Sequence, residues 1–148
     1  MKVRQDVEWV IVGALARGRR PGYFQGQSVP RAEVDAWIGK VRALGVKSII
    51  CLLAEDQLSY YGQLETDLIS YYRAAGFEVI HVPAGDHQTP PLSHDHLTAI
   101  SKAYQDLPKP VLIHCSAGLD RTGRAVEYLQ RQSEEPGSRG VAAPTGRL

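Results

Sequence analysis

The sequence predicts an α/β fold: a single domain whose mainly parallel central sheet of about four to five strands is flanked by helices. Three observations predict it. The chain has 148 residues, the size of one ordinary domain. Short β-rich apolar stretches alternate with longer stretches whose apolar residues recur every three or four positions. Glycine and proline separate many of these stretches, as expected where helices and strands end.

The first half of the chain predicts two strands and two helices. The apolar run 8–15 predicts a strand, and the Arg-, Gly- and Pro-rich residues 17–22 after it predict a loop. Residues 30–44 carry apolar side chains at helical spacing, which predicts a helix with one buried face. The run 47–53 predicts a buried strand, and residues 54–76, which end in glycine, predict a second helix.

The second half repeats this alternation. Residues 77–82 predict a strand, and the following residues 83–91 are rich in proline and other turn formers. Ser93 is a good N-cap for a helix that runs to about Leu107. The apolar residues 111–114 predict a short strand, and residues 121–132 predict the last helix.

Composition and charge exclude several classes of protein. Lys and Arg number 17 and Asp and Glu 16, so the net charge of +1 argues against a nucleic-acid-binding surface. No apolar run approaches the ~20 residues of a membrane-spanning helix, and acidic residues interrupt the N-terminal segment where a signal peptide is apolar. We therefore expect a cytoplasmic protein with a folded domain at residues 1–132 and a flexible tail at residues 133–148.

The most informative segment lies between the last predicted strand and the last predicted helix. It places Cys115 at the end of the strand and Arg121 six positions later, at the start of the helix. Successive backbone N–H groups and the helix dipole can converge there on one anion and favour the thiolate of the cysteine. Arg121 offers a planar fork of donors suited to phosphate oxygens. The residues expected to bind phosphate are Ser116, Ala117, Gly118, Leu119, Asp120 and Arg121.

The sequence His-Cys-x-x-Gly-x-x-Arg-Thr-Gly in this loop resembles the signature of the cysteine-dependent protein tyrosine phosphatase superfamily. Chain length and element order look most like its compact dual-specificity branch. The resemblance implies a phosphatase loop between the last strand and a helix, a phosphocysteine intermediate on Cys115, and no metal or other cofactor. It also implies that the Thr122 hydroxyl supports the sulfur as a leaving group and that His114 orders the loop.

Two aspartates are candidates for the acid that protonates the leaving group. Asp86 follows a predicted strand in the proline-rich loop, where the resembled family keeps a mobile acid loop, and we favour it. Asp120 lies inside the phosphate-binding loop, beside Arg121, and is the alternative acid. Its other interpretation is a carboxylate that pairs with a nearby cation.

Other residues have both a functional and a structural interpretation. Cys51 lies in a predicted strand and is expected to be a core residue; the alternative is a redox disulfide with Cys115. The arginines at positions 17, 19 and 20 either contact a substrate anion or lie in a solvated loop. The three histidines near the acid loop are not expected to bind metal, because His94 and His96 do not share a helix face. His87, next to Asp86, either tunes that aspartate or is solvated.

These features predict a phosphomonoester hydrolase: a protein tyrosine phosphatase, with dual specificity if its pocket is shallow enough for phosphoserine or phosphothreonine. Its expected partners are phosphorylated proteins or small phosphomonoesters, and the sequence makes no prediction of the oligomeric state. Three alternatives stay open. They are a phosphoinositide or inositol phosphate phosphatase with the same chemistry, a rhodanese-like sulfurtransferase, and a phosphoprotein-binding module without turnover.

Overall fold

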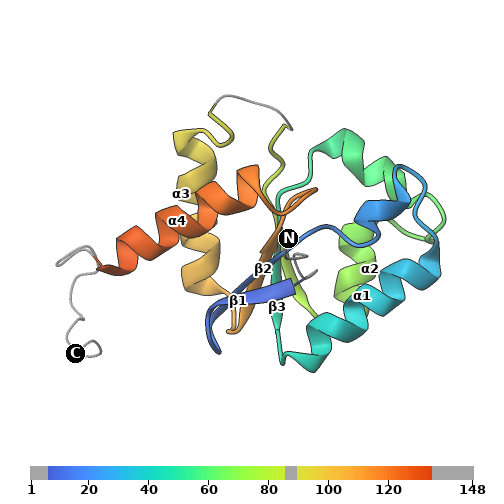
Figure 1. The fold of residues 1–148 in the computed structure, drawn as a ribbon, viewed down its shortest axis with the longest axis horizontal. Coiled ribbons are helices and arrows are strands. Elements are labelled where there is room, and N and C mark those ends of the chain that lie inside the picture. The colour runs from blue at the N-terminus through green and yellow to red at the C-terminus, as the bar shows by residue number, and fades with distance from the viewer. Residues whose placement is uncertain (1–6, 86–89, 135–148) are drawn as a thin grey trace, which may run out of the picture.

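Five strands form one sheet in the order β1-β2-β5-β3-β4 (Figure 1). The computed structural model describes residues 7–85 and 90–134. The neighbouring pairs β2/β5, β5/β3 and β3/β4 are parallel, whereas β1 is antiparallel to β2. The strands are β1 (Val7–Ile11), β2 (Leu15–Gly18), β3 (Ser48–Cys51), β4 (Glu78–His81) and β5 (Val111–His114).

Helices cover both faces of the sheet. In Figure 1, α1 (Arg31–Ala43) and α2 (Leu68–Ala74) lie on one side of the strands. On the other side lie α3 (His94–Asp106) and α4 (Asp120–Glu134). Each side has its own apolar cluster, one containing Trp37 and Tyr72 and the other containing Ile100 and Leu129. The predicted single-domain α/β architecture is therefore confirmed.

The N-terminal segment differs from the prediction of one strand over residues 8–15. The chain turns after Ile11, where the Ala14 N–H donates to the Ile11 carbonyl at 2.9 Å. Gly13 has φ 79°, a left-handed conformation that glycine adopts without strain. The segment is therefore a hairpin, and β2 extends through residues that the sequence assigned to a loop.

Residues 54–76 also differ from the single helix predicted for them. They form a 3-10 helix, η2 (Glu55–Tyr61), followed by a separate helix, α2. Asp67 begins α2 as its N-cap, because its carboxylate accepts a hydrogen bond from the Ser70 N–H at 2.8 Å. Tyr61 in η2 and Tyr72 in α2 are both buried, so apolar side chains continue across the break between the two elements.

The predicted helix that begins after Ser93 is present, and Ser93 is its N-cap. The last helix starts at Asp120 and continues to Glu134, two residues into the predicted tail. The rest of that tail lies outside the described residues. Within the part of the chain that the structure describes, no helix is long and apolar enough to cross a membrane.

Parallel pairing brings four strand ends to the same edge of the sheet. Gly18 at the end of β2 and Cys51 at the end of β3 both lie opposite His114 at the end of β5. His81 at the end of β4 lies opposite Cys51. In sheets of this kind, ligands bind beyond the carboxyl ends of the strands. The loops that follow these strands therefore meet around the segment that begins with Cys115.

Candidate active site

The loop between β5 and α4 forms a tight turn around Cys115, which we call the cradle (residues 115–121). Cys115 directly follows β5 and is 2% exposed. Gly118 has φ 77°, and a Cβ atom there would lie 2.6 Å from the Gly18 carbonyl oxygen. The cradle therefore needs glycine for two independent reasons: the left-handed backbone and the close approach of the end of β2.

Arg121 lies in the first turn of α4 and is 1% exposed. Its Nη1 donates hydrogen bonds to the carbonyl oxygens of Leu52 at 3.1 Å and Ala84 at 2.7 Å. These acceptors lie in the loops that follow β3 and β4. The guanidinium thus connects α4 to two neighbouring loops at the carboxyl edge of the sheet.

Gln57 is a third acceptor for Arg121 that sequence reasoning missed. It is buried in η2, and its Oε1 accepts from Arg121 Nη1 at 3.0 Å and from the Ala54 N–H at 3.0 Å. The Gln57 amide is uncharged, so this contact orients the guanidinium and adds no negative charge beside it. No motif marks Gln57 in the sequence, because the contact depends on the turn that η2 makes.

Two hydrogen bonds fix the tautomer of the neutral His114 ring. Its Nδ1 lies 2.9 Å from the Cys115 carbonyl oxygen, which can only accept, so Nδ1 carries the hydrogen. In the neutral ring, Nε2 then accepts from the Tyr72 hydroxyl at 2.8 Å. Burial is the largest cause that lowers the pKa of His114 from its ordinary value of 6.5 to about 4, and the positive charges of Arg121 and Arg20 contribute to the same shift. A neutral His114 therefore fixes the carbonyl of Cys115.

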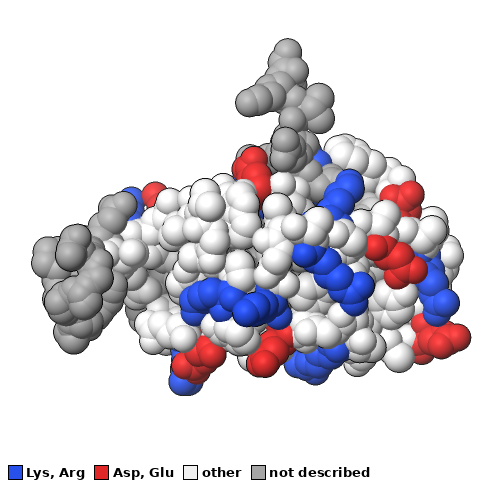
Figure 2. All heavy atoms as spheres, turned by 90° about the horizontal axis from the view of Figure 1, so that it is seen from below, with Lys and Arg blue, Asp and Glu red and all other residues white. Residues whose placement is uncertain are grey.

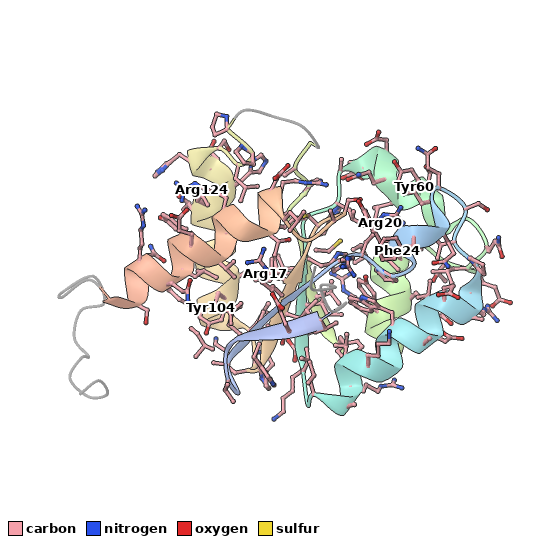
Figure 3. The ribbon with its side chains drawn as sticks, in the orientation of Figure 1. Arg17, Arg20, Phe24, Tyr60, Tyr104 and Arg124 are labelled. Carbon is pink, nitrogen blue, oxygen red and sulfur yellow. The ribbon has the colours of Figure 1, made fainter. Side chains whose placement is uncertain are left out.

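The three arginines after β1 do not form a solvated loop. Arg19 and Arg20 are 8% and 4% exposed. The Arg20 N–H donates to the Ser116 carbonyl at 2.9 Å, and its side-chain Nε donates to Ser116 Oγ at 3.2 Å. Arg17 Nη2 donates to the Gly118 carbonyl at 2.7 Å. Arg17 and Arg20 therefore brace the cradle from the side of β2 (Figure 3).

Thr122 follows Arg121 in α4 and is fully buried. Its Oγ1 has no hydrogen-bond partner among the residues that the structure describes. A buried hydroxyl without a partner is costly unless a ligand or an intermediate completes it. The role implied for Thr122, a donor to sulfur, stays a prediction.

The structure places one of the two candidate acids. Asp120 is exposed at the start of α4, whereas Asp86 and His87 lie outside the described residues. Ala84, two positions before Asp86, accepts a hydrogen bond from Arg121, so the beginning of the proline-rich loop reaches the cradle. The choice between the acids stays a prediction.

His94 and His96 lie in the first turn of α3, where one has a structural role and the other faces the surface. His96 Nδ1 accepts from the Ser93 N–H at 3.0 Å and completes the cap of α3, and His94 is exposed. Within residues 7–85 and 90–134, no group of three or more His, Cys, Asp or Glu side chains is arranged to hold a metal ion.

Cys51 is a buried thiol of the core. It packs in the cluster on the side of α1 and α2, whereas Cys115 packs in the cluster on the side of α3 and α4. Burial raises the pKa of Cys51 to about 12. Both cysteines are free thiols. These features fit the expected core role of Cys51, and the redox disulfide with Cys115 stays an untested alternative.

Known proteins resemble this chain in sequence and in fold. Dual specificity protein phosphatase OPG106 of vaccinia virus (strain Western Reserve) is 33% identical over 64 residues, which are 41% of this chain and 37% of the viral protein. The same values hold for OPG106 of the Copenhagen strain. The match therefore spans little more than a third of the length of these curated relatives.

Two solved structures share the fold. Tk-PTP in its active form is 22% identical, with a TM-score of 0.57, over 90% of this chain and 78% of that chain. The core catalytic domain of the PP-IP phosphatase SIW14 from S. cerevisiae is 20% identical, with a TM-score of 0.54, over 91% of this chain and 70% of that chain. At these identities the likeness concerns the fold alone.

Residues 27–133 match the sequence model of a family described as "Polymorphic toxin system, DSP-PTPase phosphatase". The matched range is more than half of the chain and includes the cradle, η2 and the beginning of the proline-rich loop. The resemblance noted in the loop of Cys115 thus extends through most of the fold. The chain belongs to the DSP-PTPase phosphatase family of polymorphic toxin systems.

Proposed function

We propose that the chain hydrolyses phosphomonoesters through a phosphocysteine intermediate, with phosphotyrosine in proteins as its substrate and phosphoserine or phosphothreonine as further substrates. The observation that carries the proposal is the cradle itself. It places a nearly buried cysteine between the carboxyl end of β5 and the N-terminus of α4, with Arg121 anchored beside it. Such a site combines a nucleophile with donors for a tetrahedral anion.

In the first step, the Cys115 thiolate attacks phosphorus. The S–P bond forms as the bond from phosphorus to the leaving oxygen breaks, and an acid donates a proton to that oxygen. The cradle amides from Ser116 to Arg121 and the Arg121 guanidinium hold the equatorial oxygens, where negative charge is spread in the transition state. The hydrogen bond to the uncharged Gln57 amide helps to keep the guanidinium oriented.

In the second step, water attacks the phosphocysteine. The P–O bond to water forms, the S–P bond breaks, and the proton from water passes to the acid that was used in the first step. The Thr122 hydroxyl donates a hydrogen bond to the departing sulfur and lowers the cost of its negative charge. Inorganic phosphate leaves and the thiolate is restored.

Asp86 is the acid in this proposal. The pH–rate profile of Asp86→Asn is expected to lose its basic limb, with a fall in kcat of about 10²–10⁴. Asp120→Asn is the matched control in the same site and is expected to keep the basic limb. Loss of that limb in Asp120→Asn alone would move the role to Asp120.

The substrate is recognised through its phosphate by the cradle rather than by an extended surface of one charge. Figure 2 shows Lys and Arg side chains interspersed with Asp and Glu over one face of the molecule, with uncharged surface between them. The variable cradle positions, Ser116, Ala117, Leu119 and Asp120, carry no lysine to meet additional phosphates. This favours a substrate with one phosphate over a phosphoinositide or an inositol phosphate.

A substrate panel tests the proposal. Phosphotyrosine, phosphoserine and phosphothreonine peptides, phosphoinositides, inositol phosphates and thiosulfate are compared with wild-type protein and with Cys115→Ser. The expected result is fastest turnover of phosphotyrosine peptides and no turnover by Cys115→Ser. Fastest turnover of an inositol phosphate or of thiosulfate would establish the corresponding alternative, and peptide binding without turnover would establish a binding module.

A further inference from the structure

Arg20 is a buried cation whose hydrogen bonds go to uncharged acceptors. Nε donates to Ser116 Oγ at 3.2 Å, Nη1 to the Tyr61 hydroxyl at 3.2 Å, and Nη2 to the Gly26 carbonyl at 2.7 Å. The Tyr60 ring centroid lies 4.8 Å from the guanidinium carbon (Figure 3), and the Tyr23 ring centroid lies 5.6 Å from it. The side chain is thus held in one position from several sides.

The described surroundings of Arg20 hold no carboxylate paired with it. Among the described residues, no carboxylate forms an ion pair with its guanidinium, although the residue is only 4% exposed. Burying a charge is costly unless an opposite charge is close by. An anion in the cradle, either the Cys115 thiolate or a bound phosphate, can supply that charge, because Arg20 is hydrogen-bonded to the cradle residue Ser116.

The contact with Ser116 has a direction that matters for anion binding. The Ser116 hydroxyl accepts from Arg20, so its own hydrogen stays available for donation. A hydroxyl that accepts from a cation becomes a stronger donor, since hydrogen bonds in a chain polarise one another. The Arg20 main chain also donates to the Ser116 carbonyl at 2.9 Å, so the residue after the nucleophile is held at both its backbone and its side chain.

We propose that Arg20 is a positioning residue: it holds the first turn of the cradle through Ser116 and adds a second buried positive charge beside Arg121. The inference rests on the proposed function, since it assigns Arg20 to the same site. Arg20 does not touch the reacting atoms in this arrangement. It acts on the anion through the Ser116 hydroxyl and through its charge.

Other charged and titratable groups surround the cradle and must be held constant in a test. Arg121 and Asp120 belong to α4, Arg17 reaches the cradle from β2, and His114 precedes it in β5. Cys51 lies at the end of β3 and interacts electrostatically with both Cys115 and Arg121. Replacing Arg20 keeps these side chains, but it removes a charge that lowers the pKa of His114 and of Tyr61. Alkylation of Cys115 is therefore compared at pH 7, where both groups stay neutral.

The first test measures the rate of Cys115 alkylation by iodoacetamide at pH 7, with the modified peptide identified by mass spectrometry. Arg20→Met is expected to slow this alkylation about ten-fold, because a positive charge that favours the thiolate is lost. Arg20→Lys keeps the charge and is expected to restore most of the rate. Arg73→Met is the matched control, because Arg73 also anchors a carbonyl, that of Val79, but belongs to α2.

The second test is a double-mutant cycle in turnover of p-nitrophenyl phosphate. Arg20→Met is expected to lower kcat/KM about 10- to 100-fold, since small misplacements of reacting groups are costly. In the Ser116→Ala background, Arg20→Met is expected to lower kcat/KM by a much smaller factor, because Arg20 acts through Ser116. Fully multiplicative effects would show that Arg20 does not act through Ser116.

The two tests separate this inference from the proposed function. A wild-type protein that turns over no phosphomonoester overturns the proposed function, and the alkylation measurement still reports whether Arg20 affects the thiol. An active wild type whose Cys115 alkylation rate is unchanged in Arg20→Met overturns the inference alone. Thermal denaturation of each variant is measured in parallel, and an Arg20→Lys protein that folds but is not rescued contradicts the role of charge.

Discussion

Arg121 is the residue around which the chemistry of the site is arranged. It is almost completely buried, and it is anchored by backbone carbonyls and by the amide of Gln57 rather than left to move in a solvated pocket. Preorganised donors of this kind stabilise a developing charge without reorganising during the reaction. The nature of each anchoring group is therefore expected to matter for phosphate binding.

Replacing Gln57 by glutamate tests the value of an uncharged anchor. In Gln57→Glu the new carboxylate pairs with Arg121 and competes with phosphate, so KM is expected to rise about ten-fold with a smaller change in kcat. Steady-state kinetics measures the two separately. Gln63→Glu adds the same charge to a residue that is exposed just after η2 and should leave both constants unchanged. A normal KM in Gln57→Glu would contradict the account of Arg121.

His114 predicts a pH dependence of stability. Its pKa in the folded protein, about 4, lies below its ordinary value of 6.5, so protonation favours the unfolded chain. The contribution is complete above pH 6.5 and is lost as the pH falls toward 4, and it amounts to about 3 kcal/mol. Urea denaturation at pH 7 and pH 4.5 measures it.

The matching variants isolate the effect of His114. His114→Gln is expected to reduce the difference in unfolding free energy between the two pH values. His94→Gln removes an exposed histidine at the start of α3 and is the control. An unchanged difference in His114→Gln would contradict a buried, neutral His114.

At the scale of elements, the cradle depends on the close approach of β2 to the turn before α4. Gly118 meets the carbonyl of Gly18, and Arg17 and Arg20 donate to the carbonyls of Gly118 and Ser116. The cradle is therefore fixed by contacts with β2 and with the residues that follow β2. This support was not visible in the sequence, where the arginines stood far from Cys115.

Gly118→Ala tests this close approach. The change forces a left-handed alanine and places its Cβ against the end of β2, so both stability and turnover are expected to fall, with about 1–3 kcal/mol from the backbone alone. Gly45→Ala is the matched control, because Gly45 has φ 83° but nothing within 4 Å of an added Cβ. Thermal denaturation and kcat/KM are compared for the two variants. Equal loss of stability would mean that the contact with Gly18 is unimportant.

Helices and strands were predicted most closely where a sequence signal marks both of their ends. The strand at residues 111–114 and the Ser93-capped helix were predicted closely, because an apolar run or a cap defined their ends. The segments 8–15 and 54–76 were each read as one element although each contains two. In both, apolar residues continue across the break, and the turn at Gly13 and the cap at Asp67 depend on local geometry that periodicity does not report.

At the scale of the whole molecule, topology joins residues that are distant in sequence. The parallel strands β2, β5, β3 and β4 end at one edge of the sheet. The segments that follow them carry Arg20, Gln57 and Ala84 to the cradle. The proposed nucleophile and the proposed phosphate-binding arginine could be singled out from the sequence, because they lie in one short motif. Gln57 and the role of Arg20 could not, because their contacts arise only when the sheet assembles.

The central claim is that Cys115 is the nucleophile of a phosphoryl transfer, and trapping the intermediate tests it most directly. The protein is mixed with a phosphotyrosine peptide, quenched in acid within milliseconds, digested and analysed by mass spectrometry. The account predicts one phosphoryl group on the peptide that contains Cys115, formed and lost at rates compatible with turnover, and none in Cys115→Ser. Continued turnover with no phosphate on Cys115 would contradict it.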